Sequence, residues 1–317
     1  MAAAWRYELG LRFIRARRGV DDMPFVMLNG RLVHESQATV SVFDRSFLYG
    51  DGLFETMVVW NGRPFRWEMH WERLQRGLGI LRMAMPWTQE EVMRQVAQLL
   101  EANLARHAVL RLQVSRGLGP RGYSPPARSE TVMVLSTHPL EPVAPGQPQA
   151  WRLHTASLRL PPAHALSGFK TCNKLWQVAA RVEAREQGAD EALLLSADGH
   201  LAEAAAGNLF WWAQGVLHTP PLSTGALPGV TRQIILELAH RWQWEIQETL
   251  AGPEVLDRAE GAFLTTSPLG VIEAISLDGR TLARSPLTLQ CHAGYWALMA
   301  RESEARRCAP PSLPTSL

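Results

Sequence analysis

Two lysines four positions apart are the residues of this chain most suggestive of chemistry. Lys170 and Lys174 are its only lysines, and the other thirty of its 32 basic residues are arginine. A desolvated lysine can lose its proton and form a Schiff base with a carbonyl compound, whereas arginine stays protonated. Either lysine alone is best explained as chance retention on a solvated helix face. Both within residues 167–178 indicate a carbonyl cofactor, and pyridoxal phosphate is the commonest that lysine holds.

An isolated acid supplies a second requirement of such a cofactor. Glu203 lies among small residues in the stretch 199–210. A carboxylate buried there needs a partner, and a protonated pyridine nitrogen is one. The alternative is an exposed loop carboxylate.

Two turns have the composition of an anion-binding site. Residues 227–232 precede an amphipathic helix, which leaves the backbone N–H groups of Val230 and Thr231 without helical partners. Further along, an apolar strand ends in hydroxyl residues, of which Thr266 and Ser267 are candidates for binding a phosphate. The alternatives are an ordinary helix start and a plain strand-to-loop turn.

A glycine-rich loop at 117–122 matches the dinucleotide-binding pattern but not its context. That fingerprint must open a helix, and the Tyr-Ser-Pro-Pro sequence that follows prevents one. Arg121 and Tyr123 are instead candidates for binding a substrate carboxylate through a guanidinium and a phenol. The alternative is a surface arginine in an ordinary loop.

The composition excludes several classes of function. Of 317 residues, 46% are apolar and 20% charged, and the net charge of +2 gives no reason to expect nucleic acid or an anionic membrane as partner. No apolar run reaches the ~20 residues of a membrane helix. Three scattered cysteines indicate neither a disulfide framework nor a zinc site and favour the reducing cytoplasm. The ten histidines show no metal-binding spacing, and hydrolase elbows and Walker loops are absent from the sequence.

Alternating strand-like and helix-like segments predict two α/β domains. We expect a small domain over residues 23–140, a proline-rich linker over 141–150 and a larger domain over 151–307. Residues 308–317 have the composition of a disordered tail. Residues 1–22 are interpreted as a nonessential N-terminal extension or an upstream start, and alternatively as a transit-like segment.

Hydrophobic periodicity predicts the main elements. The expected helices span 66–81, 88–104, 173–187, 230–242 and 286–306, and the expected strands span 53–60, 108–115, 131–136, 151–158, 191–196, 208–212, 245–250 and 262–266. Thr88 and Glu91 have the spacing of a capping box at the start of the second helix.

Several blocks in a fixed order resemble the fold-type IV pyridoxal-phosphate family. This family includes branched-chain and D-amino-acid aminotransferases, R-selective amine transaminases and 4-amino-4-deoxychorismate lyase. The blocks are Asp44–Thr56, His70–Leu74, Phe169–Asn173, Leu227–Arg232 and Thr265–Ser267. The resemblance implies an α/β (α+β) fold of two domains, of which the larger binds pyridoxal 5'-phosphate.

The resemblance also implies roles for individual residues. Lys170 becomes the Schiff-base lysine and the catalytic base, Arg73 a ligand of the cofactor phosphate, and Glu203 the partner of the pyridine nitrogen. The other implied contacts are Asn208, Val230, Thr231, Thr266 and Ser267 for the cofactor, and Phe54, Thr56, Arg121 and Tyr123 for the substrate. Family members imply a homodimer that acts on a small amine or carboxylate substrate.

Within the family, the chain is most similar to 4-amino-4-deoxychorismate lyase, which forms 4-aminobenzoate and pyruvate in folate biosynthesis. The stretches 121–124, 170–178, 189–193 and 208–211 carry this likeness. An aminotransferase of the D-amino-acid, branched-chain or R-amine type is the alternative, and the turn at 265–271 favours it. A catalytically silent binding protein is a second alternative, which the intact Lys170, Glu203 and Arg73 oppose.

Overall fold

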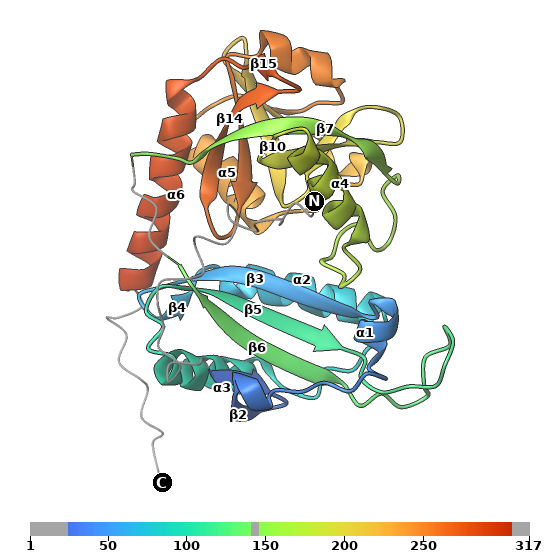
Figure 1. Ribbon diagram of the computed structural model, residues 1–317. Helices are drawn as coiled ribbons and strands as arrows, with labels where there is room; N and C mark the ends of the chain where they lie inside the picture. Colours follow the sequence, from blue (N-terminus) through green and yellow to red (C-terminus); the bar gives the residue numbers. More distant parts are fainter. Residues whose placement is uncertain (1–24, 141–145, 306–317) are drawn as a thin grey trace, which may run out of the picture.

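The computed structural model describes residues 25–140 and 146–305, which form two sheets flanked by helices (Figure 1). Each sheet with its helices is called a domain below, the first being N-terminal. The predicted extension 1–22, the first residues of the predicted linker at 141–145 and the predicted tail 308–317 lie outside the described residues.

The first domain contains a six-stranded sheet in the order β2-β1-β6-β5-β3-β4, with antiparallel neighbours throughout. Its strands are β1 (Phe25–Leu28), β2 (Arg31–His34), β3 (Gly52–Trp60), β4 (Arg63–Pro64), β5 (Ala108–Ser115) and β6 (Val132–Pro139). Its helices are α1 (Arg45–Tyr49), α2 (Trp67–Ile80) and α3 (Gln89–Ala102). The sheet buries one face under α2 and α3, because apolar residues recur at every second position of β5.

Strand β3 is buried on both faces because it lies between helices α2 and α3 of the first domain and the second domain. Leu53 and Met57 pack in the core with α2 and α3, whereas Val58 packs with residues of the second domain. Since side chains alternate along a strand, Glu55 lies on the helix side and Thr56 on the side of the second domain.

The second domain is built around strands that close on themselves. Its strands are β7 (Ala150–Leu160), β8 (Glu191–Ser196), β9 (Leu201–Ala204), β10 (Gly207–Ala213), β11 (Val216–Thr219), β12 (Ile246–Glu248), β13 (Gly261–Thr266), β14 (Gly270–Leu277) and β15 (Arg280–Thr281). Because β9 pairs with both β8 and β10, the strands β10-β13-β14-β7-β8-β9 form a closed ring.

Three helices accompany this ring, and one of them reaches the first domain. Helix α4 (Leu175–Glu186) contacts β7 and β8, and α5 (Val230–Arg241) contacts α6 (Pro286–Ala305). In Figure 1, α6 runs along the second domain and ends beside β4 of the first. Arg66, the N-cap of α2, binds Glu237 of α5 at 3.0 Å and Glu302 of α6 at 2.9 Å, which ties the domains together.

The predicted helices are confirmed to within a few residues at their ends, and the capping box is present. Thr88 Oγ1 accepts a hydrogen bond from Glu91 N, and Glu91 Oε2 accepts one from Thr88 N. Strand β14 is not anticipated from the sequence, because its first five residues are all buried and show no polar–apolar alternation. Among the described helices, none is long and apolar enough to cross a bilayer.

Candidate active site

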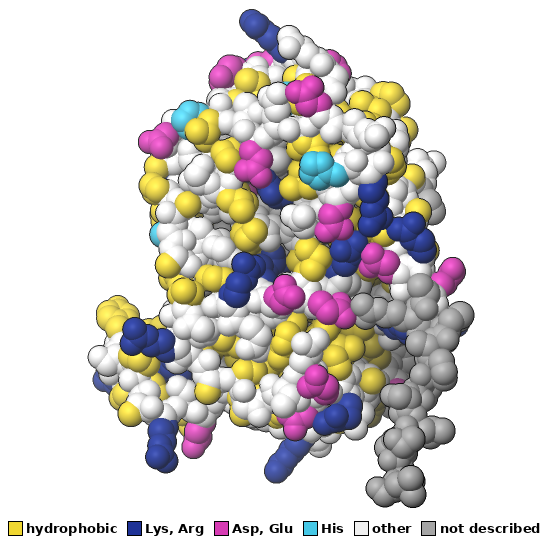
Figure 2. Space-filling model, turned by 180° about the vertical axis from the view of Figure 1, so that it is seen from behind, with side chains coloured by type: hydrophobic (Ala, Val, Ile, Leu, Met, Phe, Trp, Pro, Cys, Tyr) yellow, Lys and Arg dark blue, Asp and Glu magenta, His cyan; other side chains and the backbone are white. Residues whose placement is uncertain are grey.

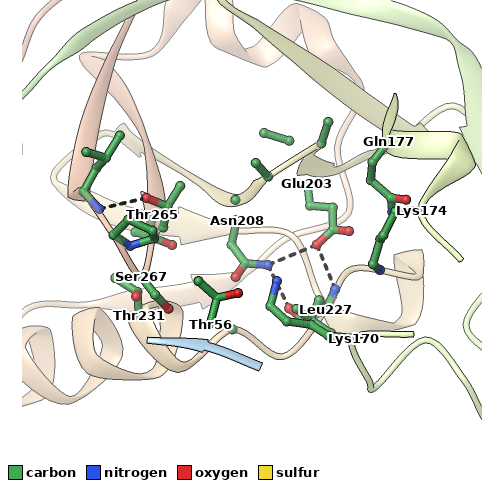
Figure 3. Close-up of a pocket in the computed structure, with 18 of the residues that line it drawn as sticks. Thr56, Lys170, Lys174, Gln177, Glu203, Asn208, Leu227, Thr231, Thr265 and Ser267 are labelled. Carbon is green, nitrogen blue, oxygen red and sulfur yellow. Dashed lines mark hydrogen bonds between the residues drawn. The ribbon is translucent and has the colours of Figure 1, made fainter. Parts of the chain in front are cut away.

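A cavity of about 680 Å³ lies where β3, the start of α4, the β9–β10 turn, the N-terminus of α5 and the β13–β14 turn meet. The sequence predicts most of its functional lining (Figure 3). The predicted residues that line it are Phe54, Thr56, Arg73, Lys170, Glu203, Asn208, Val230, Thr231, Thr266 and Ser267. Segments from both domains therefore form one site.

Lys170 is fixed beside β3 in the segment that precedes α4. Its carbonyl oxygen accepts a hydrogen bond of 2.8 Å from Phe54 N. The next residue, Thr171, forms an antiparallel bridge with Leu53. Backbone contacts with the first domain thus set the position from which the Lys170 side chain enters the cavity.

The surroundings of Lys170 make its ammonium group easier to deprotonate. Burial lowers its pKa to about 8, with the cations of Arg73 and Lys174 acting in the same direction and Glu55 and Glu203 opposing them. The free amine is the nucleophilic form of lysine. Lys170 is therefore able to attack a carbonyl group near neutral pH.

We expect the cofactor-free protein to capture pyridoxal covalently at a rate that rises with pH, with a midpoint near 8, and then levels off. The capture rate rises with pH because the free amine reacts, and the lowered pKa makes this form available at lower pH than for an ordinary lysine. Lys174→Met removes a neighbouring cation, so its midpoint is expected to lie at higher pH. Borohydride trapping followed by mass spectrometry measures the capture. A wild-type rate still rising near pH 10.5, the ordinary pKa of lysine, would contradict the perturbed pKa.

Glu203 lines the cavity and is held there by hydrogen bonds from Asn208 and Leu227. The tight β9–β10 connection places Glu203 opposite Asn208, whose side chain donates to Glu203 Oε2 at 3.4 Å and to the Leu227 carbonyl at 2.8 Å. Leu227 N donates to the same carboxylate oxygen at 2.9 Å (Figure 3). Burial raises the pKa of Glu203. A cationic ring nitrogen would add a counter-ion to the two hydrogen bonds that this buried carboxylate already accepts.

The N-terminus of α5 and the end of β13 form an anion-binding cup. The N-cap Gly229 leaves no room for a side chain, because a Cβ there would overlap Asn208 Oδ1. The first N–H groups of α5 have no intrahelical partner. Thr265 Oγ1 is buried at the cavity without a hydrogen-bond partner among the described residues. An orphaned hydroxyl that lines the same cavity as a helix N-terminus and Arg73 fits the phosphate of the predicted cofactor.

Three cations surround the ring of Phe54, and one of them is not anticipated from the sequence. The guanidinium of Arg111 lies 3.9 Å from the ring centroid, Lys170 Nζ 5.3 Å and Lys174 Nζ 6.0 Å. Arg111 pairs with Thr56 across β3 and β5, so both face the second domain. Its only signal in the sequence is a charged residue between two leucines of an alternating strand.

Arg121 and Tyr123, predicted to bind substrate, are not among the residues that line the cavity of their own chain. Their loop lies over α1 instead. The Arg45 guanidinium donates to the carbonyl oxygens of Gly122 at 3.0 Å and Tyr123 at 3.1 Å, and the Tyr123 side chain is exposed. Within one chain, the loop is therefore held away from the other predicted residues.

Known proteins resemble this chain over most of its length. The amino-transferase class IV family model matches residues 52–277. A Methanocaldococcus jannaschii protein, itself only provisionally named a branched-chain-amino-acid aminotransferase, is 34% identical over 258 residues, covering 81% of this chain and 89% of the relative. Aminodeoxychorismate lyase of Bacillus subtilis is 31% identical over 256 residues, covering 80% and 86%. The crystal structure of Escherichia coli branched-chain amino acid aminotransferase matches with a TM-score of 0.82 and 27% identity, covering 87% and 95%.

Proposed function

Because the chain belongs to the class IV aminotransferase family, we propose that it is an aminotransferase that moves an amino group between an amino acid and a 2-oxo acid. The predicted family and α/β fold are confirmed, and the cofactor is pyridoxal 5'-phosphate. The observation that carries the proposal is one cavity that joins Lys170, Glu203 and an anion-binding helix N-terminus. The aminotransferase name of the relative at 34% identity favours amino transfer over elimination.

The cavity residues match the parts of this cofactor. Arg73, the first N–H groups of α5 and the hydroxyls that end β13 would hold the phosphate, and Glu203 would meet the ring nitrogen. Lys170 would bond to the aldehyde carbon. When bound, the cofactor withdraws electrons from the carbon that carries the substrate amine.

Lys170 is the group that moves the proton in this proposal. Once the substrate amine has taken its place, the free Lys170 amine removes the proton from the amine-bearing carbon, which its lowered pKa permits near neutral pH. In an aminotransferase, Lys170 then delivers that proton to the former aldehyde carbon.

A 4-amino-4-deoxychorismate lyase is the second candidate. The B. subtilis enzyme of that name is 31% identical to this chain, and the stretch 170–178, which is similar to the lyase, contributes Lys170, Lys174 and Gln177 to the cavity. In that reaction Lys170 removes the same kind of proton from 4-amino-4-deoxychorismate. Pyruvate is then eliminated, and the ring becomes aromatic as 4-aminobenzoate.

Product analysis distinguishes these candidates. We expect the full-length holoenzyme to aminate 2-oxoglutarate or pyruvate with members of a panel of L- and D-amino acids, and to release no 4-aminobenzoate from aminodeoxychorismate. Formation of 4-aminobenzoate and pyruvate without amino transfer would refute the aminotransferase and support the lyase. A protein that binds the cofactor but performs neither reaction would be a silent binding protein.

We further propose that two copies of this chain associate through exposed apolar side chains on α1 and α4. Phe47 of α1 is 75% exposed, and Leu175 and Trp176 of α4 are 72% and 49% exposed. Figure 2 shows hydrophobic side chains on the projecting lobe at lower left, where α1 and the loop after β5 lie. Exposed groups of large apolar residues mark protein interfaces. A second copy would offer its own loop, with Arg121 and Tyr123, to the cavity.

The variant Phe47→Asp/Leu175→Asp is expected to have half the mass of the wild type in light scattering. Each chain would bring two carboxylates into the interface, and their desolvation would cost several kcal/mol. The matched control is Leu104→Asp, since Leu104 is also a highly exposed leucine but lies after α3, away from this surface. It is expected to keep the wild-type mass. A monomeric wild type at assay concentration would contradict the proposal.

A further inference from the structure

Glu55 is a buried carboxylate beside the cavity that does not line it. Its two oxygens accept hydrogen bonds of 2.8 and 2.7 Å from Nε and Nη2 of Arg73, and Oε2 lies 2.6 Å from His70 Nδ1. Burial alone would raise the pKa of Glu55, but the hydrogen bonds from Arg73 and His70 lower it to about 2. Glu55 is therefore ionised at neutral pH, and His70 must donate through Nδ1.

Arg73 carries this contact across the domain boundary. Glu55 on β3 and Arg73 on α2 belong to the first domain, whereas Arg73 Nη1 donates at 2.7 Å to the carbonyl oxygen of Pro228 in the second. Pro228 directly precedes Gly229, the N-cap of α5. The guanidinium that Glu55 holds thus also contacts the segment that presents the N-terminus of α5.

The hydrogen-bond donors of Arg73 are divided between the protein and the cavity. A guanidinium has five N–H donors in one plane. Glu55 takes the Nε donor and one from Nη2, and Pro228 takes one from Nη1. Among the described residues, no partner takes the remaining donor on each terminal nitrogen, and Arg73 lines the cavity. Because the guanidinium of Arg73 is planar and rigid, the two hydrogen bonds that Glu55 accepts along one edge fix the direction of the remaining N–H donors.

We propose that Glu55 is a positioning residue, which aims the remaining N–H groups of Arg73 at the cofactor phosphate and links phosphate binding to the contact between the domains. The inference rests on the proposed function, in which Arg73 contacts that phosphate. A charge argument alone gives the opposite sign, because removing an anion beside Arg73 would strengthen its attraction for a phosphate. Replacing Glu55 therefore distinguishes the two roles: weaker binding of the phosphate indicates positioning, whereas tighter binding indicates a charge effect alone.

The test compares pyridoxal phosphate with pyridoxal, which lacks the phosphate, in titrations of the full-length cofactor-free protein followed by tryptophan fluorescence. Glu55→Gln keeps the size of the side chain but removes its charge and one of the two acceptors that grip Arg73. Its Kd for pyridoxal phosphate is expected to rise roughly ten- to a hundredfold, with the Kd for pyridoxal unchanged. The matched control is Glu273→Gln, because Glu273 is also a buried glutamate paired with an arginine and does not line the cavity. That control is expected to leave both affinities unchanged.

A double-mutant cycle identifies the route of the effect. In an Arg73→Ala background, Glu55→Gln is expected to cause no further loss of affinity for pyridoxal phosphate. A further loss there, an equal loss for both ligands, or tighter binding by Glu55→Gln would overturn the inference. If Glu55→Gln does not fold, Glu55→Asp, which withdraws the carboxylate by one methylene, is expected to show the same phosphate-specific loss, and equal losses for both ligands would again overturn it. Failure of the proposed aminotransferase reaction is distinct, because it is read from reaction products and not from these binding constants. A wild type that binds no pyridoxal phosphate would remove the cofactor site itself.

Discussion

Lys170→Ala is expected to abolish turnover and the borohydride-stable attachment of pyridoxal phosphate, whereas Lys174→Ala keeps both. Lys170 is fixed by the backbone of β3 and has a pKa of about 8. Lys174 is a real competitor, because it also lines the cavity and burial lowers its pKa too. The expectation favours Lys170 because it occupies the matching position in the Phe-Lys-Thr-Cys-Asn block.

Peptide mapping of the reduced wild-type protein measures this directly. Label on Lys174 would show that the assignment of the two amines is reversed. Lys174→Arg provides the matched variant, since it keeps the cation but is not an amine nucleophile. If Lys174 acts through its charge, this variant is expected to retain the wild-type pH midpoint of Lys170, unlike Lys174→Met.

Glu203→Gln is expected to reduce kcat by about a hundred- to a thousandfold while the cofactor stays bound. The substitution preserves an acceptor for Leu227 N, so the local fold is retained. It removes the negative charge that would keep the ring nitrogen protonated, and electron withdrawal weakens in consequence. Steady-state kinetics and the visible spectrum of the holoenzyme measure the two effects separately.

Glu203→Asp is the companion variant, because it keeps the charge but shortens the side chain. It is expected to retain more activity than Glu203→Gln if charge is what matters. Equal losses in both variants would indicate that the hydrogen bond to Leu227, and not the charge, makes Glu203 important. Wild-type kcat in Glu203→Gln would remove Glu203 from the mechanism altogether.

Local signals account for the parts of the molecule that the sequence predicts well. Thr88 and Glu91 start α3 because both partners of the cap lie within one turn, and Lys170 with Glu203 stands out by residue type. Arg111 could not be assigned in this way, because its approach to Phe54 depends on the pairing of β3 with β5. A contact that forms only when two strands distant in sequence pair cannot be predicted from the sequence of either strand alone.

For Arg121 and Tyr123, the sequence indicates what the side chains can bind but not where they lie. Their side chains have suitable chemistry for a carboxylate, but the Arg45 contacts that direct their loop join segments more than seventy residues apart. The partner of Glu55 is equally hidden, since a family block identifies the residue without showing that α2 supplies its counter-ion. Residue type predicts what a side chain can do, whereas long-range packing decides where it does it.

Closure of the strand ring has a consequence for how this protein is produced. Glu203 lies on β9, which closes the ring, and Thr265 lies at the end of β13. The ring also needs the pairing of β7 with β14, which joins segments more than a hundred residues apart, and such long-range pairings form slowly. A chain that has not completed them lacks the finished site. A ligand that binds only the folded form stabilises it by mass action. Cofactor supplied during synthesis is therefore expected to raise the yield of native chain, and not only the activity of chain already folded.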